Sequence, residues 1–455
     1  MPRATHSVFF QNRAPRRHLV PIYAATLLLI FHTFIVAYIN SSFLEQFIPA
    51  AGVGTIYTVG SALSVLIFLF ISRVLHKVGN FKLTVGLILI NFVAVAGMAF
   101  AESLRVAIPL FLVHLISVPL IVFNIDVFME EQIGNNETAT GSRRGLLLTL
   151  ASLVGAISPL VSSMLIDQAG GSFTNAYALS AATLIPVLAI LFFYFKDFSD
   201  PEYDEIDLFA AIRTFWEQTN IRFVFLAHFV LQIFFMFMVV YTPLYLTNNI
   251  GLSWAEFGIV MFFAQMAYVL LEYPIGIIAD KFIGEKEMMG FGFLIIAIST
   301  SWIAFVTLSS VLVWAIIMFA TRVGASFVEV TTESYFFKQT KSSDAQVISF
   351  FRITRPLAYV VGAVLASLSL LYLPFNLVFI VLAALMIPAM FFTLNIEDTK
   401  WFRVNTAYFC RQSFLHCVNS LAGFVVSRYQ IRLDVPAAYA KTLFFRLSDT
   451  SKLLL

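Results

Sequence analysis

The sequence has little charge and almost no cysteine. Only 12% of its 455 residues are Asp, Glu, Lys or Arg, about half the share in a typical soluble domain, whereas 60% are hydrophobic. A chain of this composition cannot cover itself with polar side chains, so a soluble globular protein is excluded. The two cysteines, Cys410 and Cys417, both lie near the C-terminus, which excludes a disulfide framework and a CxxC metal site.

Motifs for catalysis and for nucleotide binding are missing as well. The sequence contains no HExxH, GxSxG or Walker A motif and no cluster of Cys and His. We therefore expect no enzyme activity, no metal and no cofactor. The net charge of +2 does not indicate nucleic-acid binding, because the basic residues are spread over short connections between apolar runs.

Long apolar runs make up most of the sequence. About 20 predominantly apolar residues are needed to cross the hydrocarbon of a membrane. Twelve segments meet this requirement, which predicts a polytopic membrane protein. They are approximately residues 19–40, 50–72, 83–101, 106–129, 145–166, 174–195, 223–246, 254–279, 289–308, 311–337, 347–371 and 374–395.

The basic residues are distributed unevenly between the two sides of these spans. The N-terminus and the even-numbered connections hold 18 of the 28 Lys and Arg residues, and the C-terminal tail holds 8. The odd-numbered connections hold only Arg105. The positive-inside rule therefore predicts a multi-pass protein of the plasma or inner membrane, with both termini in the cytoplasm.

The spans fall into two related groups of six. HKVG at 76–79 in the first group corresponds to DKFIG at 280–284 in the second, as expected after a duplication. Parallel repeats of this kind place a solute site near the midplane between the halves. The predicted organisation is a cytoplasmic tail (1–18), a six-helix bundle (19–196), an interfacial linker helix (197–222), a second six-helix bundle (223–395) and a cytoplasmic tail (396–455).

The segment GIIADKFIGEKE, residues 276–287, resembles the loop motif of the major facilitator superfamily. Gly276, Asp280, Lys281, Gly284 and Lys286 match the motif, with one additional residue before the second glycine. The first-half copy, at 72–82, keeps Lys77 and Gly79 but has His76 in place of the aspartate. The resemblance covers about residues 19–395. It implies an all-α membrane protein with twelve transmembrane helices in two six-helix bundles, which acts as a monomer and moves a small solute.

The resemblance also implies a charged gate at the cytoplasmic face. In the second half we expect Lys281 to pair with Glu333, and in the first half Asp126 and Glu130 lie at the corresponding end of span 4. The alternative, that these acids are solvated helix ends, stays open. The complete set of gate candidates is Gly276, Asp280, Lys281, Gly284, Lys77, Gly79, Asp126, Glu130, Glu333 and Arg352.

Span 10 carries charges inside the membrane. Arg322, Glu329 and Glu333 lie within an arc of about 60° on a helix. A charge at the bilayer centre costs at least about 3 kcal/mol, so Arg322 and Glu329 must face a polar cavity or each other. One interpretation is a pair that locks helices together, and the other is a site for solute and protons. We favour the second, with Glu329 as the leading candidate for proton coupling.

Three further polar residues within the spans complete the candidates for solute binding and proton coupling: His32, Glu272 and Gln265. His32 lies at the depth of Arg322, and an unperturbed imidazole titrates near pH 6.5. A lone histidine on an apolar helix is more often a hydrogen-bonded packing residue, and this alternative stays open for His32 as it does for His114 and His228.

Together these features predict a secondary active transporter that works by alternating access and is coupled to protons. GAISPL, residues 155–160, resembles a motif typical of exporters and favours export slightly. The alternatives are an uptake symporter and a receptor-like member of the fold that does not transport, which the altered first motif would allow. The expected partners are a small-molecule solute, protons and membrane lipid, without nucleic acid.

Overall fold

The computed structural model describes residues 18–133, 137–201, 213, 216–339 and 345–397, all within one compact unit that spans residues 1–399. Residues 1–17 of the predicted N-terminal tail, half of the predicted linker helix and nearly all of the C-terminal tail lie outside the described residues.

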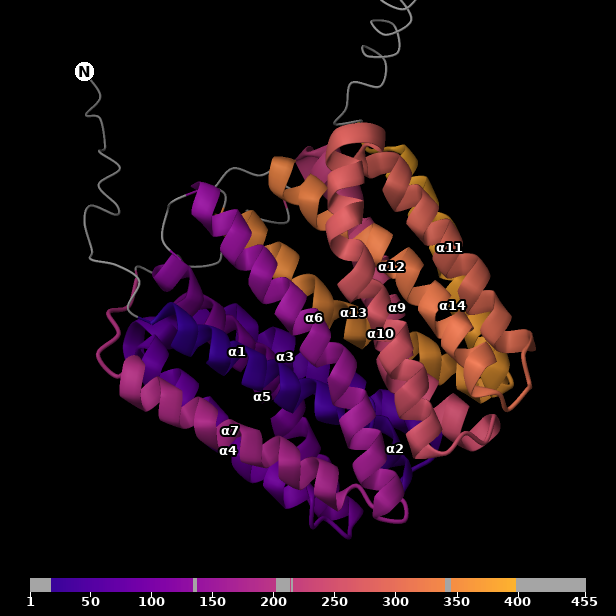
Figure 1. Ribbon diagram of the computed structural model, residues 1–455, viewed down its shortest axis with the longest axis horizontal. Helices are drawn as coiled ribbons and strands as arrows, with labels where there is room; N and C mark the ends of the chain where they lie inside the picture. Colours follow the sequence, from indigo (N-terminus) through magenta and orange to yellow (C-terminus); the bar gives the residue numbers. More distant parts are fainter. Residues whose placement is uncertain (1–17, 134–136, 202–212, 214–215, 340–344, 398–455) are drawn as a thin grey trace, which may run out of the picture. The chain divides into compact units, whose positions relative to one another are not determined.

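All described elements are helices (Figure 1). Twelve helical segments are long and apolar enough to cross a membrane, which confirms the predicted number of spans and the all-α fold class. The first half comprises α1 (Leu19–Ala37), α2 (Asn40–Glu45), α3 (Ala50–Val78), α4 (Asn80–Met98), α5 (Leu104–Ile133), α6 (Glu137–Gln168) and α7 (Thr174–Tyr194). The second half comprises α9 (Thr219–Leu244), η1 (Tyr245–Asn249), α10 (Trp254–Ile278), η2 (Ala279–Ile283), α11 (Glu285–Phe305), α12 (Val311–Gln339), α13 (Ala345–Tyr372) and α14 (Phe375–Leu394).

Each half forms its own bundle of six spans. In the first half α1 packs against α7 and α4 against α5, and in the second half α11 packs against both α12 and α14. The halves meet where α6 packs against α10 and α3 against α13, as Figure 1 shows for α6 and α10. We call the end of the bundles at which the chain turns at Gly79 and Gly284 the motif end, and the opposite end the far end.

The two motif turns share one backbone conformation. Gly79 has φ 84° and Gly284 has φ 101°, both in the left-handed region that favours glycine, and each residue immediately precedes a helix. In the first half the backbone N–H of Asn80 donates to Asp200 Oδ1 at 2.7 Å, so a carboxylate lies at the positive end of α4. The chain that follows α7 is therefore attached to the first half.

The additional residue in the second-half motif has a structural counterpart. α10 continues into a π-helical turn, η2, immediately before Gly284. A π-turn accommodates one more residue than an α-helical turn while the flanking helix axis is kept. In the first half, where the motif lacks this residue, α3 is α-helical up to Val78.

Candidate solute and coupling site

Arg322 lies in the middle of α12 and is 2% exposed. Its Nη1 donates to Thr321 Oγ1 at 3.2 Å, and its guanidinium carbon lies 5.6 Å from the ring centroid of Phe234 on α9. No ion pair joins it to a carboxylate of the described residues. Because a guanidinium stays protonated in proteins, the second half encloses a positive charge that is not ion-paired with any described carboxylate.

The face of α10 that packs against α12 carries further polar groups. Gln265, Tyr268 and Glu272 follow one another at helical spacing, and Tyr268 lies within electrostatic range of both Arg322 and Glu329. The Gln265 Oε1 and Tyr268 hydroxyl atoms are buried and have no hydrogen-bond partner in the described part of the chain. Buried polar atoms of this kind are rare in folded proteins and call for an explanation.

Three carboxyl groups gather on the motif side of Arg322. Glu329 lies within electrostatic range of Glu272, Glu333 and Arg355, the last on α13. Glu329 is seven residues from Arg322, about 10 Å along the helix axis, and no ion pair joins the two described side chains. The helix-locking pair considered from the sequence is therefore not formed.

Glu272 also connects this carboxyl cluster to the first half. Ser152 Oγ on α6 donates to Glu272 Oε2 at 3.4 Å, across the contact between α6 and α10. The carboxyl cluster, which consists of Glu272, Glu329 and Glu333, therefore borders the interface between the halves.

Sequence reasoning missed the tyrosines at this interface. The rings of Tyr57 on α3 and Tyr359 on α13 lie 6.4 Å apart between centroids, and the buried Tyr57 hydroxyl has no hydrogen-bond partner among the described residues. From the sequence, a tyrosine in an apolar span is interpreted as a packing residue. The only signal for a functional role was a polar hydroxyl group within a membrane span.

His32 lies elsewhere, inside the first bundle. Its Nδ1 donates to the Ser180 carbonyl at 2.9 Å, and its Nε2 accepts from Asn91 Nδ2 at 2.9 Å. Asn91 Oδ1 in turn accepts from His114 Nδ1 at 2.9 Å. These bonds join α1, α4, α5 and α7, and they fit a neutral His32 that donates through Nδ1. The structure does not bring His32 together with Arg322 or Glu329.

His228 in the second half is bonded in a similar way. Its Nε2 accepts from Gln232 Nε2 at 3.1 Å, and its Nδ1 lies 3.3 Å from Thr332 Oγ1. The imidazole packs on Phe351 with a centroid distance of 4.4 Å. Both nitrogens of the ring are thus occupied by neutral groups, as in a packing histidine.

The structure describes the side chains of only some of the predicted gate residues. The side chains of Asp280, Lys281, Glu130 and Arg352 lie outside what the structure describes. Of the others, Glu333 is exposed on α12, Lys77 is exposed at the end of α3, and Asp126 is partly buried on α5, while Gly276 lies near the end of α10. The gate pairs therefore remain a prediction.

The residues next to the second motif brace their own bundle. Glu285, fully buried at the start of α11, forms an ion pair with Lys338 at the end of α12 and accepts from Ser334 Oγ at 3.3 Å. Lys286 Nζ donates to the Leu394 carbonyl at 2.9 Å, at the negative end of α14. Sequence reasoning did not single out Glu285, because a carboxylate beside a loop usually faces solvent.

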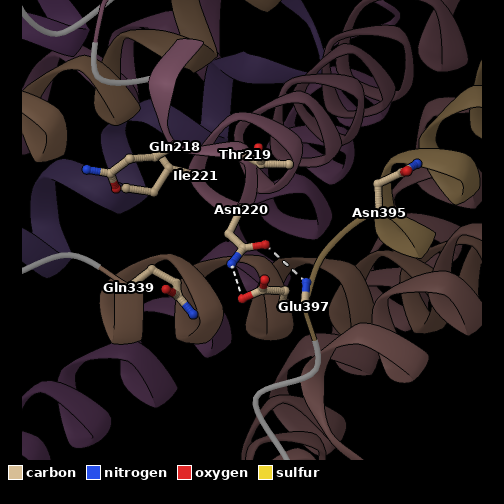
Figure 2. A pocket seen from close by; sticks show the side chains of 7 residues that line it. All are labelled: Gln218, Thr219, Asn220, Ile221, Gln339, Asn395 and Glu397. Atoms are coloured by element: carbon tan, nitrogen blue, oxygen red, sulfur yellow. Dashed lines mark hydrogen bonds between the residues drawn. The ribbon is translucent and has the colours of Figure 1, made fainter.

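A pocket of about 450 Å³ opens at the motif end of the second half. Figure 2 shows Asn220 bridging the side chain and the backbone N–H of Glu397, with both distances 3.0 Å. Its lining consists of Gln218, Thr219, Asn220, Ile221, Gln339, Asn395 and Glu397. None of these belongs to the charged residues on α10 and α12, so this pocket is separate from the candidate site.

The described chain has twelve helices that are long and apolar enough to cross a membrane, and it encloses charged groups beside the contact between its halves. This combination is typical of multi-pass membrane proteins with a transporter fold. A family model described as Major Facilitator Superfamily matches residues 223–425, the half with the better preserved motif. The second half of the chain is thus similar to the major facilitator superfamily, the family that the loop motif resembles. No curated protein sequence matches.

Three solved structures share the fold. The nucleoside transporter NupG is 12% identical, with 83% of this chain and 100% of that chain covered and a TM-score of 0.65. The POT family transporter PepTSo is 12% identical, with 84% and 98% covered and a TM-score of 0.68. A POT family transporter in complex with 5-aminolevulinic acid is 14% identical, with 83% and 96% covered and a TM-score of 0.69. At these identities the likeness shows the fold alone.

Proposed function

We propose that the protein is a secondary active transporter that moves a small solute by alternating access, with proton flow as the driving force. The observation that carries this proposal is the placement of Arg322, Glu272 and Glu329 within apolar spans, beside the contact between the two six-helix halves. Charges in membrane spans mark solute and ion pathways, because their burial is costly without a function.

The contacts between the halves suit an interface that opens and closes. At the far end Asn248 Nδ2 donates to Glu45 Oε2 at 2.6 Å, and Ser367 Oγ donates to the Ala51 carbonyl at 2.9 Å. On the motif side of the midplane Ile353 packs into an apolar cluster of the first half. The contacts of α6 with α10 and of α3 with α13 are extensive, and one apolar core includes residues of both halves. Alternating access therefore requires part of this shared packing to break on one side while the helix contacts within each half persist.

The carboxyl cluster can couple the separation of the two halves to the binding or release of a proton. Glu272 and Glu329 are close enough to repel, and neighbouring carboxyl groups favour a state in which one of them carries a proton. Ser152 donates to Glu272 from the other half. Separation of α6 from α10 would remove this donor and change how tightly the cluster holds its proton. Glu333, Arg355 and Tyr268 are the other charged or titratable groups that face it.

Direction and orientation complete the proposal. The protein lies in the cell membrane with its motif end facing the cytoplasm, because the basic residues gather on that side. It acts as a monomer. Export is favoured over uptake by Pro159, which lies inside α6 within the exporter-like GAISPL segment. His76, in place of the first motif's aspartate, leaves a receptor-like role as the second candidate.

Flux in reconstituted vesicles tests the proposal. Labelled carboxylates, sugars, amino acids and nucleosides would be offered with and without a pH gradient, to the wild type and to Glu329→Gln. The variant keeps shape but cannot titrate, so pH-driven accumulation should fall more than tenfold while downhill exchange persists. Glu287→Gln, at an exposed acid on α11, is the control.

Three outcomes would count against parts of this proposal. Unchanged pH-driven flux in Glu329→Gln would exclude that residue as the coupling group. Loss of both activities in a folded variant would make Glu329 a solute contact instead. A wild type that moves none of the four solute classes under either condition would favour the receptor-like role.

A further inference from the structure

We infer that the transported solute carries an anionic group, a carboxylate or a phosphate, which binds Arg322 and supplies its missing counter-charge. This inference rests on the proposed transport function and names the class of solute for the same site.

The first argument is the isolation of Arg322 within the protein. Its contacts are one neutral hydroxyl, Thr321 Oγ1, and the ring of Phe234. A ring face attracts a guanidinium but cannot neutralise it. An enclosed charge whose partner is absent is strongly unfavourable, so its presence on a membrane helix indicates a functional role.

The second argument is that the described carboxyl groups of the site lie away from Arg322. Glu329 lies about 10 Å further along α12 and interacts with Glu272, Glu333 and Arg355. The positive and the negative parts of the site are thus separated along one helix. A solute anion can occupy the first part while the carboxyl cluster exchanges a proton at the second.

The third argument is the chemistry of the groups around Arg322. A guanidinium presents parallel N–H donors that match two oxygens of a carboxylate or phosphate. Tyr268, within electrostatic range of Arg322, has a buried hydroxyl without a partner among the described residues, and a tyrosine hydroxyl donates well to an anion. Gln265 lies one turn away on α10 with an unbonded Oε1. It can accept from a hydroxyl or amine elsewhere on the solute.

One experiment does not require the solute to be known. In purified full-length protein without solute, Arg322→Met should raise the apparent melting temperature by about 2 °C or more, because it removes a buried charge without an ion pair. Lys338→Met should lower it, because Glu285 loses its ion pair. Arg105→Met, at an exposed arginine at the start of α5, is the matched control and should change little. A lower or unchanged melting temperature for Arg322→Met would overturn the inference.

A second experiment identifies the anion. Benzoate and glutarate would be compared with benzamide and glutaramide, and phenyl phosphate and inorganic phosphate would be tested separately. At least one anion should stabilise the wild type by about 2 °C or more, whereas the amides should not. Arg322→Met should abolish this effect, and Arg322→Lys should keep part of it. Equal effects of acids and amides, no effect of any anion, or an effect that survives in Arg322→Met would overturn the inference.

Vesicle flux separates this inference from the proposed function. If an anion stabilises the protein through Arg322 but no solute crosses the membrane, the anion site stands and the transport proposal fails. If a neutral solute is transported and none of the tested anions inhibits it, transport stands and the anion inference fails.

Discussion

In the first half of the molecule two buried histidines and an asparagine are bonded to one another, whereas in the second half a buried arginine has no ion pair with the described residues. His32, Asn91 and His114 satisfy each other inside a single bundle. Arg322 is buried and Tyr268 has a buried hydroxyl, and both retain bonding capacity in the described structure. These two polar sets therefore differ: the first is uncharged and closed by its own hydrogen bonds, and the second includes a charge that is not paired within the described structure.

The difference indicates a division of roles between the halves. A closed neutral network rigidifies the bundle that contains it, because every member loses a partner if one of them moves. An incomplete charged set costs stability, and such sites are found where function requires them. Under the proposed function, we expect the first half to act mainly as a wall of the pathway and the second half to hold the solute and coupling groups.

The largest effect on stability should come from breaking the neutral network. Asn91→Leu removes both histidine bonds, which leaves His32 Nε2 and His114 Nδ1 buried without partners. At about 1–3 kcal/mol for each orphaned group, the free energy of unfolding should fall by roughly 2–6 kcal/mol. Thermal denaturation in detergent measures this, and flux per folded molecule should stay within about twofold.

Asn395→Leu, at an exposed asparagine, is the control for that substitution. The comparison between the halves would fail if Asn91→Leu were as stable as this control. It would fail in the opposite way if Asn91→Leu were stable but lost transport, because His32 would then belong to the pathway.

A smaller effect is expected where the halves touch. A Cβ on Gly54 of α3 would lie 2.2 Å from Ser367 Oγ, 2.3 Å from the Tyr241 hydroxyl and 2.9 Å from the Ala363 carbonyl. The carbonyl belongs to the backbone of α13, so Gly54→Ala must push α3 and α13 apart, at a cost of about 1–3 kcal/mol. Because this contact forms when the far end closes, we expect transport to fall about tenfold or more.

Gly86→Ala provides the matched comparison, since a Cβ there meets no atom within 4 Å. Alanine favours a helix over glycine at both positions, so helix propensity cannot explain a loss seen only at Gly54. Equal flux in the two variants would show that the close approach of α3 to α13 is not needed for the transport cycle.

The smallest effect should come from an exposed helix cap away from both polar sets. Ser253 caps α10 through a reciprocal pair of bonds with Glu256, in which Ser253 Oγ accepts from the Glu256 N–H and Glu256 Oε2 accepts from the Ser253 N–H. Ser253→Ala should lower the free energy of unfolding by about 1 kcal/mol and leave flux unchanged. A loss of transport would place the far end of α10 in the pathway.

The sequence predicted the spans well because a membrane span leaves a simple signal. Twenty apolar residues in a row are visible without knowledge of tertiary contacts, and the motif glycines at 79 and 284 were placed at turns that require their conformation. The enclosed positions of Arg322 and Gln265 also followed from the cost of placing polar groups in lipid.

What the sequence could not give was the choice of partner. His32 and Arg322 lie at similar depth, but only the packing of α1 against α4 and α7 determines that His32 finds Asn91 and Ser180. The sequence places Glu285 beside a loop, and only the packing of α11 against α12 brings it into contact with Lys338. The π-turn η2 depends on the fit of α10 to its neighbours and has no pattern of its own.

The bond between Asn80 and Asp200 also determines how the two bundles are tethered. Asp200 anchors one end of the connecting chain to the first bundle, and Asn220, bonded to Glu397, anchors the other end to the second. Only residues 201–219 lie between these two anchor points. The contour length of this tether sets an upper limit on how far the anchors can separate, because each residue spans at most about 3.6 Å. The amplitude of the rocking motion is thus bounded by covalent geometry.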